Sequence, residues 1–166
     1  MIRKNDDSKR LLEVVCIEDL VPKDHILRKI DKYIDFSFIS ELTRPYYSLD
    51  NGRPGVDPIV LFKMVFLRHL FGISSERQLV KDIQVNVAYR WFLGFSLTED
   101  IPSPSTISMN RIRRFNGTNV AQEVFSNIAS QAMKYGLVVQ ENFHADADKE
   151  KLLVQQVAKC IKDYSK

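Results

Sequence analysis

The chain has 166 residues, of which 45% are hydrophobic and 27% are charged, as is typical of one ordinary globular domain. This composition excludes disorder along the whole length. Two cysteines, Cys16 and Cys160, lie near opposite ends of the chain, which excludes a disulfide framework and a zinc-ligand spacing. We therefore expect a reduced, cytoplasmic setting.

Membrane association is not expected from the hydrophobic pattern. Residues 1–20 are charged throughout and contain no long apolar run of the kind found in secretory signals. The most apolar window, 59–71, is interrupted by Lys63, Arg68 and His69 and is shorter than the roughly 20 residues that cross a bilayer. This window predicts a core helix.

The net charge of +3 is concentrated in one part of the chain. Residues 101–136 contain one acidic residue, Glu123, and four basic ones, whereas basic and acidic residues balance elsewhere. The four basic residues are Arg111, Arg113, Arg114 and Lys134. A local positive field of this kind is expected where a protein contacts nucleic acid.

Turn and cap signals divide the first third of the chain into short helices. Asp24 is placed to cap a helix that runs to residue 34, and a second helix is expected over 36–42. That helix should end before Pro45, because a proline disfavours helical backbone in the residue preceding it. The stretch "LDNGRPGVDP" (49–58) combines several turn signals and predicts a loop.

Three helices are expected next. Asp57 and Pro58 form a strong start for a helix over 58–71, which is apolar on nearly every side and should lie at the centre of a bundle. Gly72 ends this helix, and "SSERQLVKDI" opens another with serine caps. "NVAYRWFLGF" predicts a further short helix closed by Gly94.

The stretch "SPSTISMNRIRRF" (103–115) predicts an arginine-rich helix, with Ser103 or Ser105 as its cap and Pro104 at its first position. At about 100° per residue, one side should carry three apolar residues: Met109, Ile112 and Phe115. The other side should carry Ile107 and a polar set: Asn110, Arg111, Arg113 and Arg114. No carboxylate lies three or four residues away to neutralise these arginines.

The polar side of this segment has the chemistry that reads DNA. Arginine can fork onto guanine, asparagine can pair with adenine, and neighbouring arginines or free helix-start N–H groups can hold phosphates. A preceding helix and a tight turn would make the segment the second helix of a helix-turn-helix. The alternative interpretation is a solvated charged face.

A long periodic helix is expected over 118–135, ended by Gly136, with a short strand near 137–143 and an amphipathic helix over 149–164. The sequence therefore predicts an all-α fold, a compact multi-helix bundle that contains a helix-turn-helix.

Three stretches, taken together, carry a family resemblance: "VPKDHILRKIDKYIDFSFI", "GRPGVDPIVLFKMVFLRHLFGISSERQLVKDIQVNVAYRWFLGF" and "IPSPSTISMNRIRRF". In this order and spacing they resemble the N-terminal, InsH-like domain of bacterial insertion-sequence DDE transposases. The resemblance implies that residues 1–136 form a helical domain that binds the terminal inverted repeats of the element, in double-stranded DNA. The DNA-facing role carries over to six residues: Ser105, Thr106, Asn110, Arg111, Arg113 and Arg114. Relatives commonly have a polar or basic residue in place of Ile112 and often histidine in place of Pro104, which implies a smaller basic surface here.

The resemblance also concerns catalysis, which relatives perform with a following ribonuclease H-like domain. Strand transfer needs carboxylates that converge on two Mg²⁺ ions. Where relatives carry the first aspartate, after the long helix, this chain reads "GLVVQENFHADADKEKLL", with His144 directly after Phe143. We therefore expect residues 137–166 to be a remnant of the linker and catalytic start plus the C-terminal helix. We expect a truncated chain that is not an enzyme and has no catalytic residues, no metal site and no cofactor.

Two alternatives involve the last 30 residues. His144, Asp146 and Asp148 would share one face of a strand and form a weak Mg²⁺ or Mn²⁺ site, although a polar loop that caps the last helix is the plainer interpretation. The apolar stripe in "LLVQQVAKCI" consists of Leu152, Leu153, Val157 and Ile161. It favours an alternative function, a truncated transposase that acts as a dimerising regulatory module, either as a homodimer or with intact transposase.

The remaining candidates have structural interpretations. His25 and His69 lack a second ligand at helical spacing and are interpreted as ordinary surface or core histidines. The aromatic cluster around Trp91 is interpreted as core packing that buries the indole. Arg77 and Arg90 either contact phosphate or cap and pair locally.

Overall fold

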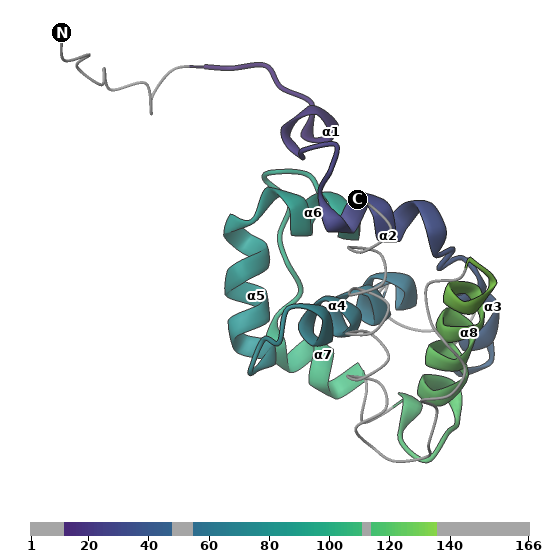
Figure 1. Ribbon diagram of the computed structural model, residues 1–166. Coiled ribbons are helices and arrows are strands. Elements are labelled where there is room, and N and C mark those ends of the chain that lie inside the picture. Colours follow the sequence, from purple (N-terminus) through teal and green to yellow (C-terminus); the bar gives the residue numbers. More distant parts are fainter. Residues whose placement is uncertain (1–11, 48–54, 111–113, 136–166) are drawn as a thin grey trace, which may run out of the picture.

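The computed structural model describes residues 12–47, 55–110 and 114–135, and every regular element in these ranges is helical (Figure 1). The elements in order are α1 (Ile17–Leu20), α2 (Ile26–Tyr33), α3 (Phe38–Thr43), η2 (Arg44–Tyr46), α4 (Pro58–Leu70), α5 (Glu76–Val85), α6 (Val87–Leu93), α7 (Pro104–Asn110) and α8 (Val120–Lys134). The predicted all-α bundle is confirmed. The strand near 137–143, the helix over 149–164 and the proposed boundary after residue 136 lie outside the described residues.

Helix α4 lies at the centre of the bundle, with α3, α5 and α6 packed against it (Figure 1). It starts as predicted: the Asp57 carboxylate accepts the Ile59 N–H at 2.8 Å, and Pro58 occupies the first position. Met64 and Phe66 are 0% exposed, as expected for a helix that is apolar nearly all round. No helix in the described ranges is long and apolar enough to cross a membrane.

The helix junctions on either side of α5 also follow the predicted signals. Gly72 and Gly94 adopt positive φ of 64° and 80° where α4 and α6 end, which is the conformation that glycine tolerates best. Ser75 caps α5 through its hydroxyl. Asn86 ends α5 and caps α6, its side chain accepting an N–H of the first turn of α6 at 3.1 Å, so the two helices meet at a sharp corner.

Two predicted boundaries are wrong. His25, not Asp24, caps α2, because its Nδ1 accepts the Leu27 N–H at 3.2 Å. The helical backbone also continues past residue 42: Arg44, which precedes Pro45, keeps φ −48° and ψ −42°, and η2 follows α3 directly. Tertiary packing of the turn against residues after α7 outweighs the local effect of the proline here. The four-residue α1 was not predicted at all.

The core combines aromatic rings, several of them packed edge to face, with aliphatic side chains. The Phe36 ring meets Phe66 at 5.7 Å and Phe92 at 5.8 Å, both edge to face, which joins the segment after α2 to α4 and α6. Helix α8 packs against α3. Its buried residues recur at helical spacing, as expected of the predicted periodic helix: Val120, Val124, Phe125, Ile128, Ala129 and Ala132.

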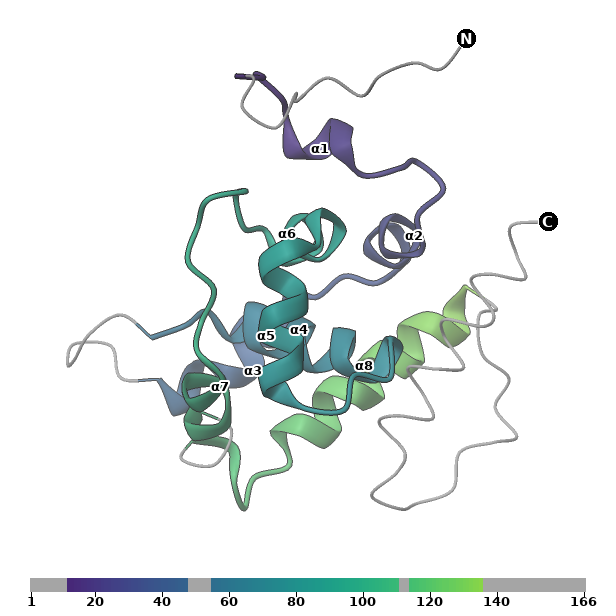
Figure 2. The same cartoon turned by 90° about the vertical axis from the view of Figure 1, so that its left-hand side faces the viewer.

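Helix α1 lies outside the bundle and is fastened to it by three side chains (Figures 1 and 2). The Arg28 guanidinium donates to the Glu18 carboxylate and, through Nε, to the Val21 carbonyl at 3.2 Å, and it lies 4.6 Å from the centre of the Trp91 ring. The Trp91 indole N–H donates to Glu18. The hydrogen bond from Arg28, followed by that from Trp91, holds the pKa of Glu18 below its ordinary value. Trp91 is therefore half-buried beside Glu18 and Arg28 and is not buried in the core as predicted. We call the contacts among Glu18, Arg28 and Trp91 the clasp.

Candidate nucleic-acid interface

The start of α7 brings three hydroxyl groups together. Ser103 is confirmed as the cap: its Oγ accepts the Thr106 N–H at 3.2 Å, and Pro104 is the first helical residue. The Ser103 hydroxyl also lies 2.9 Å from the hydroxyl of Ser105 and 2.9 Å from that of Thr106. Hydroxyls of this kind are common partners of DNA phosphates.

The rotation of α7 differs from the prediction. Ile107 is 3% exposed and Met109 is 39% exposed, whereas the sequence predicted Met109 on the core side and Ile107 on the polar side. Phe115, 8% exposed, is buried as predicted. Ile107 of α7 and Phe115 of the segment after it both belong to the core. Both line a cavity of about 130 Å³ between α4 and α8.

Helix α7 is anchored to α5 and not through a tight turn to α6. The Ser108 hydroxyl donates to the Glu76 carboxylate in the first turn of α5. Residues 94–103 form a long connection from α6 to α7 (Figure 2), so the tight turn expected before α7 is absent from this junction. The sharp corner lies instead between α5 and α6, and most of α6 is buried. Of α6 and α7, α7 is the one with accessible polar side chains: Ser105 is exposed, and Thr106 and Asn110 are half-buried.

Arg90 fixes the connection that leads to α7. Arg90 is 7% exposed, and its guanidinium donates to the carbonyls of Ser96 at 2.7 Å, Glu99 at 3.0 Å and Gln84 at 3.3 Å. All of these acceptors are backbone groups of the described chain. Arg90 therefore pairs locally and holds the loop, and it is not available to phosphate.

Arg114 is stacked and does not project freely. The carbon at the centre of its guanidinium lies 4.1 Å from the centre of the Tyr47 ring, a cation–π contact, and the side chain is half-buried. Its Nη1 is buried without a hydrogen-bond partner among the described residues. A side chain at Gly55 would place its Cβ 3.3 Å from the guanidinium nitrogens, so this glycine leaves just enough room for Arg114.

The charge of Arg114 is not neutralised by the part of the protein that the structure describes. The ion pairs in the described ranges are Arg28 with Glu18 and Lys63 with Asp31, and Arg114 belongs to neither. Burial raises the pKa of Tyr47 above its ordinary value, and the positive charge of Arg114 offsets only part of that effect. The ring beside Arg114 is therefore a neutral phenol at physiological pH and does not neutralise the guanidinium.

Four of the six predicted site residues line one open depression of about 350 Å³: Ser105, Thr106, Asn110 and Arg114, together with Met109. Nδ2 of Asn110 donates to the Thr106 carbonyl at 2.8 Å, while its Oδ1 accepts no hydrogen bond from the described residues. The other two predicted residues, Arg111 and Arg113, lie outside the described residues, as does Ile112.

The other candidates either have structural roles or lie outside the described ranges. His25 is a helix cap whose pKa is lowered by burial, and His69 lies 6.2 Å from the Phe125 ring beside the cavity under α7. The described residues contain no group of three or more potential ligands that could hold a metal ion. The segment with His144, Asp146 and Asp148 and the apolar stripe of residues 152–161 are not described.

Sequence reasoning missed Tyr47 and Gly55, which shape the surroundings of Arg114. Both lie beside turn signals that the sequence does show, in "TRPYY" and "GRPG". Neither stretch contains a periodic pattern that would pair it with residue 114. A contact between positions so far apart along the chain follows only from the way α3, α4 and the segment after α7 pack.

Comparison with protein families matches residues 15–113 to the transposase domain family (DUF772). The chain belongs to this family. The matched range includes α1 to α7 and ends just before Arg114. Neither the comparison with curated proteins nor that with solved structures finds a match. Membership confirms the resemblance in the sequence and supports a role related to transposases.

Proposed function

We propose that this chain is a DNA-binding module of an insertion-sequence transposase, which recognises the terminal inverted repeats of its element. One observation carries the proposal: four of the residues that the resemblance assigns to DNA line a single open depression on α7 and the segment after it. Membership of a transposase domain family supports the transposase-related part of this proposal.

The groups in this depression suit both parts of DNA recognition. The hydroxyls of Ser105 and Thr106 and the guanidinium of Arg114 are suited to phosphate oxygens, which set the position of a protein on the duplex. Oδ1 of Asn110 can accept the exocyclic N–H of adenine without rearrangement. Nδ2 carries two hydrogens, so its bond to the Thr106 carbonyl leaves one hydrogen for the second bond of the adenine pairing.

The proposal assigns DNA binding to this chain but not strand transfer. Strand transfer uses carboxylates that bind two metal ions. The sequence after α8 has His144 directly after Phe143, where the resemblance places an aspartate. The chain is therefore expected to bind DNA without cleaving it.

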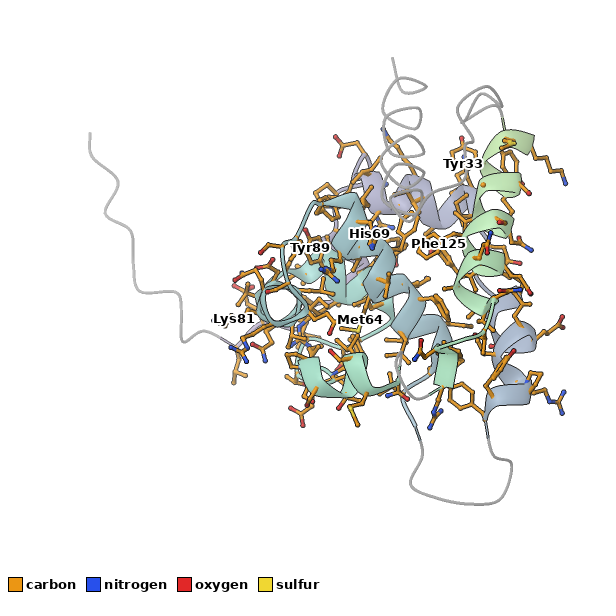
Figure 3. All side chains as sticks on the ribbon, turned by 90° about the horizontal axis from the view of Figure 1, so that it is seen from below. Tyr33, Met64, His69, Lys81, Tyr89 and Phe125 are labelled. Carbon is orange, nitrogen blue, oxygen red and sulfur yellow. The ribbon has the colours of Figure 1, made fainter. Side chains whose placement is uncertain are left out.

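The test is binding to a labelled duplex that carries the inverted repeats, followed by fluorescence anisotropy between roughly 50 and 200 mM salt. Alanine at Arg111, Arg113 and Arg114 together should make the slope of log affinity against log salt less steep by about 2.7, at about 0.9 per phosphate contact. The control is Lys81→Ala, which removes one exposed cation on α5, away from the proposed interface (Figure 3). A triple variant with the affinity and slope of this control would refute the proposal.

Recognition of the DNA sequence is tested separately with Asn110→Ala. Loss of a base contact should reduce the preference for repeat DNA over a scrambled duplex by about tenfold, within the 1–3 kcal/mol typical of such contacts, and leave the salt slope unchanged. If the variant weakens both duplexes equally, Asn110 contributes to general affinity and does not read a base.

A further inference from the structure

The turn after α3 lies against the residues that follow α7. Tyr46, the last residue of η2, has its ring 6.1 Å from that of Phe115, in an edge-to-face arrangement. The next residue, Tyr47, stacks against Arg114. Residues 44–47 therefore form one rim of the surface that carries Arg114, although the sequence separates them widely.

This rim presents an uncompensated cation. Arg44 is exposed, and its side chain makes no hydrogen bond or ion pair with any described residue. Glu41, one helical turn before it, is exposed and does not pair with it. Tyr46 beside it is 40% exposed, so the rim combines a guanidinium and a phenol ring at the surface.

Tyr47 has a different role on the same rim. Its ring lies flat against the charge of Arg114, and its hydroxyl lies 3.4 Å from the Val56 carbonyl, so the ring is held from two sides. A Cβ at Gly55 would lie 3.3 Å from both terminal nitrogens of Arg114, so the backbone there leaves little free space beside the guanidinium. These contacts restrict Arg114 to one orientation, which lowers the entropy that the side chain would lose on binding a phosphate.

We propose that the turn formed by residues 44–47 is a second wall of the DNA interface, in which Arg44 contacts a backbone phosphate and Tyr47 is a positioning residue for Arg114. This inference rests on the proposed function and extends it to a segment outside the arginine-rich stretch. B-DNA carries one negative charge per about 1.7 Å of its axis, so two guanidinium groups on adjoining parts of one surface meet nearby phosphates of the same duplex.

Arg44→Ala tests the phosphate contact in the anisotropy assay, with Lys81→Ala as the control. Helices α3 and α5 lie on opposite sides of the bundle, so the two variants remove exposed cations from different surfaces (Figures 1 and 3). Arg44→Ala should reduce the steepness of the salt slope by about 0.9 and weaken repeat and scrambled duplexes equally, because phosphates carry no sequence information.

The outcomes separate this inference from the proposed function. If Arg44→Ala behaves like Lys81→Ala while the triple arginine variant loses affinity, the second wall is wrong and the proposed function stands. If the unaltered protein shows no salt-dependent DNA binding, both fail. Equal thermal midpoints for the two alanine variants show that the comparison is between folded proteins.

The positioning role is tested with Tyr47→Leu and Tyr47→Phe. Leucine removes the aromatic face and should reduce the steepness of the slope by as much as Arg114→Ala does, and combining the two changes should reduce it no further. Phenylalanine keeps the face and should restore the slope. If Tyr47→Leu lowers the thermal midpoint but leaves the slope unchanged, the ring only supports the fold and the positioning role is refuted.

Discussion

In the proposed function the rotation of α7 decides which side chains face DNA, and this rotation can be tested by comparing Ile107→Ala with Met109→Ala. Ile107 is 3% exposed and packs under the helix, whereas Met109, two residues further on, is 39% exposed. The two substitutions make changes of similar size on opposite sides of a seven-residue helix. They therefore report its orientation with little interference from helix propensity.

The expected cost of Ile107→Ala follows from what the side chain loses. The change removes three carbons, at about 0.8 kcal/mol each when buried, or roughly 2.4 kcal/mol. Enlargement of the adjoining cavity of about 130 Å³ adds to this cost, because the surroundings collapse only partly. We expect the free energy of unfolding to fall by about 3 kcal/mol. Met109→Ala, at the surface, should change it by about 0.5 kcal/mol or less.

Urea denaturation followed by tryptophan fluorescence measures both values. Trp91 is the sole tryptophan, so its emission reports one site, and circular dichroism at 222 nm checks that the helices unfold in the same transition. If Met109→Ala proves the more damaging change, α7 is rotated as the helical wheel predicted. The depression with Asn110 and Arg114 would then not be the accessible face.

Three further predictions concern other contacts. The hydrogen bond from Arg28 lowers the pKa of Glu18, so the contacts among Glu18, Arg28 and Trp91 stabilise the fold above pH 4.5. This stabilisation is lost as the pH falls through the lowered pKa of Glu18. The fluorescence emission of Trp91 should change in that pH range, and Glu18→Gln should abolish this change. Asp57→Ala removes the cap of α4 and should cost about 1 kcal/mol in urea denaturation, whereas Asp57→Asn should restore most of it. Gly55→Ala should displace the guanidinium of Arg114 and lower DNA affinity a few-fold in the anisotropy assay, with an unchanged thermal midpoint. An unaltered affinity would mean that Arg114 accommodates the added methyl group.

The helices that the sequence predicted well are those with local determinants. Asp57, Ser75 and Ser103 satisfy N–H groups within their own first turns, so their positions alone define where α4, α5 and α7 begin. Helix α8 is long enough for its apolar spacing to define a buried side without ambiguity. These features depend on residues that lie close together in the chain.

The sequence mispredicted side-chain positions where contacts between distant segments determine which residues are buried. A seven-residue helix has too few apolar positions to fix its rotation, so the burial of Ile107 depended on α4 and α8. The stack of Arg114 on Tyr47 joins segments that no periodicity relates. Trp91 is likewise half-buried because Glu18 and Arg28 meet above it, a clasp that sequence spacing does not reveal.

The buried guanidinium of Arg90 has a consequence for the energetics of recognition. By tying the carbonyls of Ser96 and Glu99 to α6, it holds the long connection in place before any ligand arrives. Under the proposed function, the DNA-binding surface is thus preorganised, and binding to a duplex need not include the ordering of this connection. Without Arg90, residues 94–103 would have to become ordered during binding. Coupled folding and binding of this kind slows association even where every contacting side chain is intact.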